Sequence, residues 1–182
     1  MLLVAGFAAL MPGFVVAAGS QTGTSYIPPT FATRVAAISL ITGVSLTLLG
    51  LITFDTILWK AGDRIMSGLG TASYAAAAIS WVVATGRALA LHEWTYDLEV
   101  VFVLAAGFSM LAFGAAVLRT RVIPRWAGWV AVGWSTAGLI LFALPSENYP
   151  PLLVQFVPLL VGITLLRASR RAASSAPADL RE

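Results

Sequence analysis

The sequence predicts an all-α, polytopic membrane helical bundle with six transmembrane helices and both termini in the cytoplasm. Three observations lead to this fold class. Hydrophobic residues make up 59% of the 182 residues and charged residues 10%, with a mean hydropathy of +0.89, whereas charged residues are about a quarter of an ordinary soluble domain. The apolar residues form long unbroken runs, which favours helices over a barrel of short alternating strands. The basic residues collect in every second loop.

Each expected span is an apolar run near the length that crosses a bilayer, about 20 residues. The runs cover residues 1–19, 31–54, 65–90, 98–118, 126–144 and 151–166. We treat residues 1–169 as one transmembrane domain and expect residues 170–182, rich in Ala, Ser and charge, to form a disordered cytoplasmic tail. Ala17-Ala18-Gly19 resembles a signal-peptide cleavage site, but the first run lacks a basic segment before it, so we expect it to be retained.

The orientation follows from lysine and arginine in short loops, which favour the cytoplasmic side. If six spans alternate, the loops after the second, fourth and sixth spans share one side of the membrane. These loops hold Lys60, Arg64, Arg119, Arg121, Arg125, Arg167, Arg170 and Arg171, whereas the opposite loops hold Glu93, Asp97 and Glu147. We therefore place both termini in the cytoplasm.

Composition excludes several kinds of chemistry. The chain has no cysteine, which rules out disulfides, zinc–thiolate sites and iron–sulfur clusters. Its single lysine, Lys60, lies in a loop and cannot hold retinal inside a span, and its single histidine, His92, cannot form a bis-histidine haem site. Nucleotide-binding and hydrolase motifs are absent. The net charge of +3 reflects helix ends and not a nucleic-acid surface. We expect no cofactor and no nucleic-acid partner.

Polar residues inside four of the spans lie at a similar depth near the outer surface. Arg34 and Arg87 lie about one turn from the outer ends of the second and third spans, and Glu99 and Gln155 occupy similar positions in the fourth and sixth. Ionisable residues inside spans usually face the bundle interior and are paired. We therefore expect these four side chains to converge, either as a structural network or as an outward-facing pocket for an anion or a lipid headgroup.

A second polar cluster lies in the outer loop between the third and fourth spans. His92, Glu93 and Asp97 are metal-ligating residue types close together in sequence. A solvated interfacial loop is the simpler explanation for them, so they form only a weak metal candidate, and we expect no metal.

Small residues in the spans predict where helices approach closely. Ala72, Ala76 and Ser80 form one such row, and Ala127 and Ala131 form another.

Two further residues carry local predictions. Asp63 precedes the third span and suits its N-cap. Pro158, inside the sixth span, predicts a kink.

The segment Pro124-Arg125-Trp126-Ala127-Gly128-Trp129 follows a short basic loop and opens a glycine-rich span. This step resembles that of a family of small bacterial six-helix membrane proteins, which is known only as a domain of unknown function. The resemblance covers about a third of the chain in detail. It implies a bacterial inner membrane protein, but no activity, catalytic residue or cofactor.

Three functions remain open at this point. The first is a non-catalytic membrane module, or accessory subunit, that contacts membrane lipids and packs against another membrane protein or a second copy. The second is a small transporter, or a lipid- or anion-binding protein, that uses the outer polar residues. The third, a membrane enzyme, is disfavoured because no base and nucleophile share one depth.

The orientation gives a first testable prediction. A reporter enzyme fused after Glu182 should be active if it works only in the cytoplasm and inactive if it works only in the periplasm, because the basic loops hold that side inside. Activity of the periplasmic reporter at this position would reverse the topology.

Overall fold

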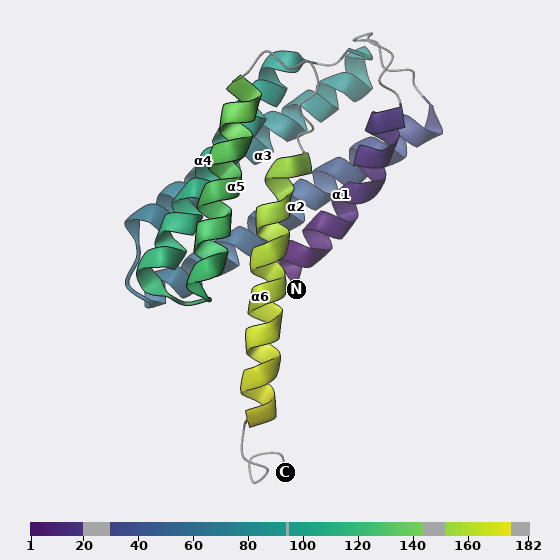
Figure 1. The fold of residues 1–182 in the computed structure, drawn as a ribbon. Helices are drawn as coiled ribbons and strands as arrows, with labels where there is room; N and C mark the ends of the chain where they lie inside the picture. The colour runs from purple at the N-terminus through teal and green to yellow at the C-terminus, as the bar shows by residue number, and fades with distance from the viewer. Residues whose placement is uncertain (20–29, 94, 144–151, 176–182) are drawn as a thin grey trace.

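The computed structural model describes residues 1–19, 30–93, 95–143 and 152–175, and its fold is all-α (Figure 1). Six α-helices follow one another along the chain. They are α1 (Leu2–Gly19), α2 (Phe31–Lys60), α3 (Ile65–Leu91), α4 (Tyr96–Thr120), α5 (Arg125–Ala143) and α6 (Leu152–Ser175).

Four of these helices, α2 to α5, are long and apolar enough to cross a membrane. This finding confirms a helical protein of membrane type. The apolar part of α1 among the described residues is the shorter segment Leu2–Val15. A total of six spans, and the side on which the termini lie, therefore remain predictions.

Two helices extend beyond the apolar runs that predicted them. Helix α2 continues past residue 54 to Lys60, and α6 continues past residue 166 to Ser175, into the segment predicted to be a disordered tail. A helix satisfies its own backbone in water as well as in lipid, so it need not end where the apolar run ends. Residues 144, 147, 151 and 176–182, on which other predictions fall, lie outside the described residues.

The helices pack in sequence order around a closed circuit. Each helix packs against the next one, and α6 packs against α1 as well as α5. Helix α4 also contacts α2 and α6, and it is the most covered of the four long apolar helices. Beyond the bundle, the C-terminal part of α6 projects away from the other helices (Figure 1).

Helices α1 and α2 approach each other at glycines of α2. A Cβ atom placed on Gly43 would lie 2.8 Å from the carbonyl oxygen of Gly6 and even closer to the side chain of Leu10. One heptad further along α2, a Cβ atom on Gly50 would lie 2.6 Å from the side chain of Leu3. Both glycines therefore leave room for a leucine of α1.

The same arrangement occurs in the opposite direction. Gly13 of α1 leaves room for Leu40 of α2, and Gly6 leaves room for Thr47. Large and small residues thus alternate on both helices and fit one another as the helices run antiparallel. Close backbone approach at small residues is how helices associate in lipid, where apolar tails provide no hydrophobic drive between them.

A serine of α2 joins the backbone of α1 next to Pro12. The N–H of Gly13 donates to Ser39 Oγ at 3.1 Å, and the Ser39 hydroxyl donates in turn to the carbonyl oxygen of Ala9. These two backbone groups pair directly with each other in a regular helix. Ser39 therefore bridges the turn of α1 that contains Pro12.

Glycines also bring α4 and α5 together. A Cβ atom on Gly128 would lie 3.1 Å from the carbonyl oxygen of Gly114, and one on Gly114 would lie 3.1 Å from that of Gly128. The predicted row of Ala127 and Ala131 is buried beside this contact. The other predicted row, on α3, is buried only in part.

In that row, Ser80 is buried, whereas Ala72 and Ala76 are exposed on the surface of α3. Small size permits close approach of a helix, but it does not say whether a neighbour is present. The prediction of a packed row was therefore correct at Ser80 and wrong at Ala72 and Ala76.

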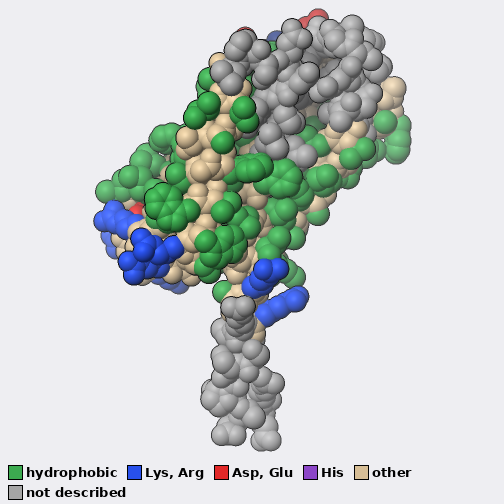
Figure 2. Space-filling model, viewed as in Figure 1, with side chains coloured by type: hydrophobic (Ala, Val, Ile, Leu, Met, Phe, Trp, Pro, Cys, Tyr) green, Lys and Arg blue, Asp and Glu red, His purple; other side chains and the backbone are tan. Residues whose placement is uncertain are grey.

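Basic side chains lie at one end of the bundle. The turns between α2 and α3 and between α4 and α5 lie at this end, where lysine and arginine side chains gather (Figure 2). The exposed basic residues of these turns and of α6 are Lys60, Arg64, Arg119, Arg121, Arg125, Arg167 and Arg170. Between the two ends the visible surface is mostly hydrophobic (Figure 2).

The glycine contact of α4 and α5 gives a prediction with a matched control in the same helix. Gly128→Leu should lower the thermal stability in detergent, because Leu118 and the Gly114 carbonyl occupy the space that its side chain needs. Overpacking of this kind costs about 1–3 kcal/mol. Gly133→Leu should leave the stability of the isolated protein unchanged, since nothing lies within 4 Å of a Cβ atom at Gly133. Arg121→Ala, at an exposed position, should also change the thermal stability little. Equal destabilisation by Gly128→Leu and Gly133→Leu would contradict the glycine contact.

Candidate functional site

Three buried polar side chains meet in the bundle interior. Tyr74 of α3 donates its hydroxyl hydrogen to Oε1 of Gln155 of α6 at 3.1 Å. The side chain of Thr47 of α2 lies next to the Tyr74 hydroxyl. Each of the three is no more than 1% exposed. We call Thr47, Tyr74 and Gln155 the polar centre, and it joins three helices.

The polar centre is not fully hydrogen-bonded. Gln155 Nε2 is buried without a hydrogen-bond partner among the described residues. The Thr47 hydroxyl donates to the carbonyl oxygen of Gly43, one turn earlier in its own helix, at 2.8 Å. The two hydroxyl hydrogens are therefore used, while the amide still has hydrogens to donate.

The polar centre lies on a longer row of hydrogen-bonding groups along α3. Residues three or four apart share one face of a helix, and this face of α3 and the turn before it is polar over most of its length. It carries Asp63, Ser67, Thr71, Tyr74, Ala78, Trp81 and Thr85, of which all but the half-buried Thr71 are buried. We call this face the α3 stripe. Thr71 Oγ1 and Thr85 Oγ1 are, like Gln155 Nε2, buried without a hydrogen-bond partner.

Asp63 closes the α3 stripe at the basic end of the bundle. Its Oδ1 accepts the backbone N–H groups of Met66 at 3.0 Å and Ser67 at 3.2 Å. Oδ2 lies 3.8 Å from Nη1 of Arg119. The carboxylate therefore caps α3 as predicted, although Arg64 holds the N-cap position of the backbone. The cap fixes the first turn of α3 and the start of the stripe.

A second interhelical hydrogen bond holds α4 against α3. The Ser109 hydroxyl donates to the carbonyl oxygen of Gly70 at 2.7 Å, and both residues are buried. Gly70 also leaves room for the ring of Phe113. Trp81 and Phe102 form another contact between these helices, with ring centroids 4.4 Å apart. These contacts fix the position of α3 in the bundle.

The four polar residues predicted near the outer surface occupy different environments. Gln155 is buried and bonds to Tyr74, which was not among the four. Arg34 and Arg87 are exposed, and Glu99 is half-buried. The structure therefore takes Gln155 into the interior and leaves both arginines at the surface. Convergence of all four on one pocket remains a prediction.

The weak metal candidate lies at the junction of α3 and α4. His92 adopts a left-handed backbone with φ of 57° and ends α3, its N–H donating to the carbonyl oxygen of Ala88. Glu93 and Asp97 are exposed. The described residues contain no group of three acidic or histidine side chains placed to hold a metal ion.

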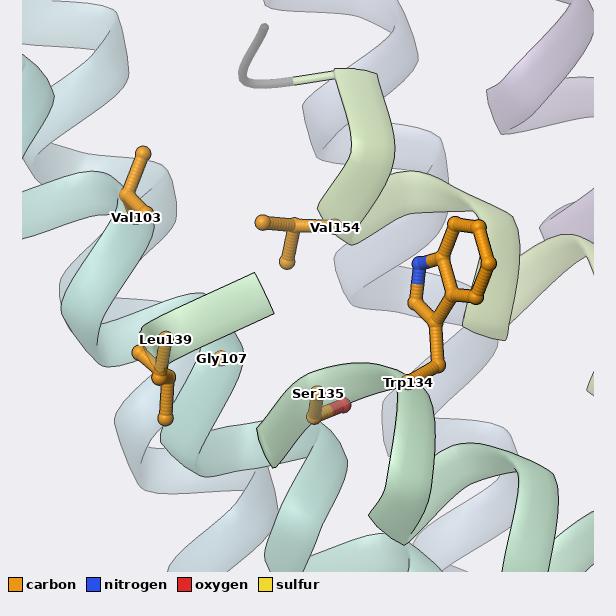
Figure 3. Close-up of a pocket in the computed structure, with 6 residues that line it drawn as sticks. All are labelled: Val103, Gly107, Trp134, Ser135, Leu139 and Val154. Carbon is orange, nitrogen blue, oxygen red and sulfur yellow. The ribbon is translucent and has the colours of Figure 1, made fainter. Parts of the chain in front are cut away.

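A small crevice lies between α4, α5 and α6 (Figure 3). Its volume of about 10 Å³ is roughly the room that one water molecule needs. The lining residues are Val103, Gly107, Trp134, Ser135, Leu139 and Val154. The Trp134 ring packs against Phe156 with centroids 6.0 Å apart, and Phe156 packs against Phe7 at 5.6 Å. This aromatic row holds α6 between α5 and α1.

No protein-family model, curated protein or solved structure matches this chain.

The polar centre was only partly visible in the sequence. Gln155 was selected because an amide inside an apolar run stands out. Tyr74 and Thr47 were not selected, because a single tyrosine or threonine is common in a transmembrane helix. The available signal was the spacing of Ser67, Thr71 and Tyr74, which repeats the helical period on one face.

The hydrogen bond in the polar centre can be measured by a double-mutant cycle. Tyr74→Phe, Gln155→Leu and the double variant should show a coupling free energy of about 0.6 kcal/mol, and at most about 1.7 kcal/mol, as for hydrogen bonds between other transmembrane helices. The measurement is unfolding in mixed micelles. Tyr96→Phe, at a tyrosine that is 65% exposed, serves as the control and should not be coupled to Gln155→Leu. A coupling free energy of zero between Tyr74 and Gln155 would contradict the hydrogen bond.

Proposed function

We propose that this chain is a non-catalytic membrane module, an accessory subunit that packs against another membrane protein through one face of α5. The observation that supports this proposal is the exposure of α5. Only 28% of its apolar stretch is buried within the chain, compared with 61% for α4. Helix α5 therefore presents more uncovered apolar surface than its neighbour.

The exposed surface of α5 has the spacing of a helix-packing face. Its residues recur three or four positions apart, as Trp126, Val130, Gly133, Ala137 and Ile140, and all are exposed. We call this set the open α5 face. At its middle, Gly133 and Ala137 are small residues four positions apart, a spacing typical of close helix contacts in membranes.

Glycine in a helix needs a physical reason, because it is about 1 kcal/mol less favourable than alanine there. At Gly128 the reason is visible, since α4 occupies the space beside it. At Gly133 the described part of the chain places nothing within 4 Å of a Cβ atom. A transmembrane helix of a partner, either a second copy or a different membrane protein, would use this space in the same way.

The positions of charged groups support a role without catalysis. In α2 to α4 the acidic and basic side chains lie within about one and a half turns of a helix end. The middle of these helices carries the hydroxyl groups of serine, threonine and Tyr74 in place of ionised side chains.

The setting that we assign is the cell membrane of a bacterium, crossed six times, with both termini in the cytoplasm. The basic end of the bundle supports this orientation. The step that resembles the small bacterial six-helix family begins α5, where the N–H of Ala127 donates to the carbonyl oxygen of Pro124 at 2.9 Å. Trp126 and Trp129 are exposed at this end, as expected for tryptophans at a membrane interface.

The alternative is a small transporter or a lipid- or anion-binding protein. One observation favours it, namely the polar centre inside the bundle. Gln155, which this alternative would place in an outward-facing pocket, is however only 1% exposed. Gln155 therefore does not line an open pocket.

The open α5 face can be tested by photo-crosslinking in native membranes. A benzophenone amino acid replacing Val130, which is 43% exposed on this face, should crosslink to a protein. The same amino acid replacing Ile79, which is 65% exposed on α3, should react with lipid only. Gly133→Leu should abolish the protein crosslink from position 130 without lowering the stability of the chain. Reaction with lipid alone at both positions would refute the proposal.

A further inference from the structure

Unpartnered polar atoms in the bundle concentrate around the α3 stripe. Thr71 Oγ1 and Thr85 Oγ1 lie on the stripe, and Gln155 Nε2 lies across from it on α6. Tyr74, which bonds to Gln155, stands between the two threonines along α3. These three groups thus lie along one line through the bundle, whereas the buried Asp55 Oδ1, also without a hydrogen-bond partner, lies on α2.

Leaving such atoms unpaired is unfavourable in an apolar interior. A buried amide or hydroxyl without a hydrogen bond costs about 1–3 kcal/mol in proteins, and buried water is the usual partner that removes this cost. A bare threonine can turn to a carbonyl of its own helix, as Thr47 does. A buried glutamine amide has no such local solution.

The polar centre is chemically suited to water. The hydrogen of Tyr74 goes to Gln155 Oε1 and that of Thr47 to the Gly43 carbonyl. Each hydroxyl oxygen keeps a lone pair, and the amide keeps its N–H groups. A molecule that both accepts from the amide and donates to a hydroxyl oxygen would complete the set. If the amide is turned over, its carbonyl becomes the unpaired end, and the same molecule still fits.

We propose that the α3 stripe holds internal water molecules on both sides of Ala78 and forms a path for protons through the bundle, with the polar centre at its middle. In each step a hydronium ion transfers one proton to the next water molecule, so that one O–H bond breaks and another forms. No oxidant or other reactant is needed. The hydroxyls of the stripe hold the waters in line, and Tyr74 is a positioning residue that fixes the Gln155 amide.

Spacing along the stripe identifies the step that limits conduction. Neighbouring polar residues from Asp63 to Tyr74 are three or four positions apart, which is about 4.5–6 Å along the axis, a distance that one water molecule can bridge. Between Tyr74 and Trp81 only Ala78 lies on the stripe, so polar groups are absent for about 10 Å. This dry segment is the barrier in the path.

The barrier makes the proposal testable by a gain of function. Ala78→Ser places a hydroxyl on the stripe at the barrier and should raise the proton flux. The control is Ala77→Ser, which adds the same hydroxyl on a neighbouring face of α3. Both alanines are buried, at 5% and 0% exposure, so the two variants carry a similar packing cost.

The measurement is proton flux into liposomes that contain the purified full-length chain and an internal pH-sensitive dye. A potassium diffusion potential set by valinomycin drives the flux. The wild-type chain should conduct above protein-free liposomes, Ala78→Ser should conduct faster than wild type, and Ala77→Ser should not. Gln155→Leu and Thr85→Val should both reduce the flux to the protein-free level. Ser135→Ala removes a buried hydroxyl away from the stripe and should leave it unchanged.

Two results would overturn the proposal. One is a wild-type flux equal to that of protein-free liposomes, which means that the polar centre only holds helices together. The other is an equal effect of Ala78→Ser and Ala77→Ser, which means that any leak does not follow the stripe. Gel filtration of each variant checks folding. Because Thr85 lies far along α3 from Tyr74, Thr85→Val tests the path without removing the Tyr74–Gln155 hydrogen bond. The inference goes beyond the role of the open α5 face, and failure of either leaves the other standing.

Discussion

Close approach of helix backbones at glycines is the constraint on which this fold depends. Inside lipid, apolar side chains gain little by leaving one surface for another, so contact between helices must come from fitted surfaces and hydrogen bonds. Gly43 and Gly50 allow α1 to lie against α2, and Gly114 and Gly128 allow α4 to lie against α5. These two pairs are joined through α3 and α6, where Gly70 leaves room for the Phe113 ring of α4 and Gly162 leaves room for Leu3 and Val4 of α1.

Polar and aromatic side chains also hold α3 and α6 in the bundle. Ser109 ties α4 to the backbone of α3, Tyr74 ties α3 to α6, and the row from Trp134 through Phe156 to Phe7 fixes α6 between α5 and α1. Single interhelical hydrogen bonds between membrane helices are weak. The bundle thus combines rigid pairs packed at glycines with a middle helix that carries unsatisfied polar groups.

The sequence was sufficient for the all-α fold and the approximate helix positions, because long apolar runs and the residues that flank them are local signals. It also identified the Asp63 cap, since capping depends on a residue and the next turn. It did not identify the partner of Gln155, because Tyr74 lies 81 positions away and no local pattern connects them. The exposure of Ala72 and the burial of Ala127 likewise depend on which helix lies alongside, which residue size alone does not encode.

If α1 crosses the membrane as predicted, the bridge made by Ser39 bears on how the first two helices enter it. At the turn of α1 that contains Pro12, the Gly13 N–H and the Ala9 carbonyl are joined through a hydroxyl that belongs to α2. A proline also leaves the carbonyl four residues earlier without its usual donor. Helix α1 on its own would therefore expose this turn to hydrocarbon, where unpaired backbone groups are costly. Insertion of α1 and α2 together, as a hairpin already joined at Ser39, avoids that exposure. Stable insertion of α1 would then depend on the synthesis of α2, which follows it in the chain.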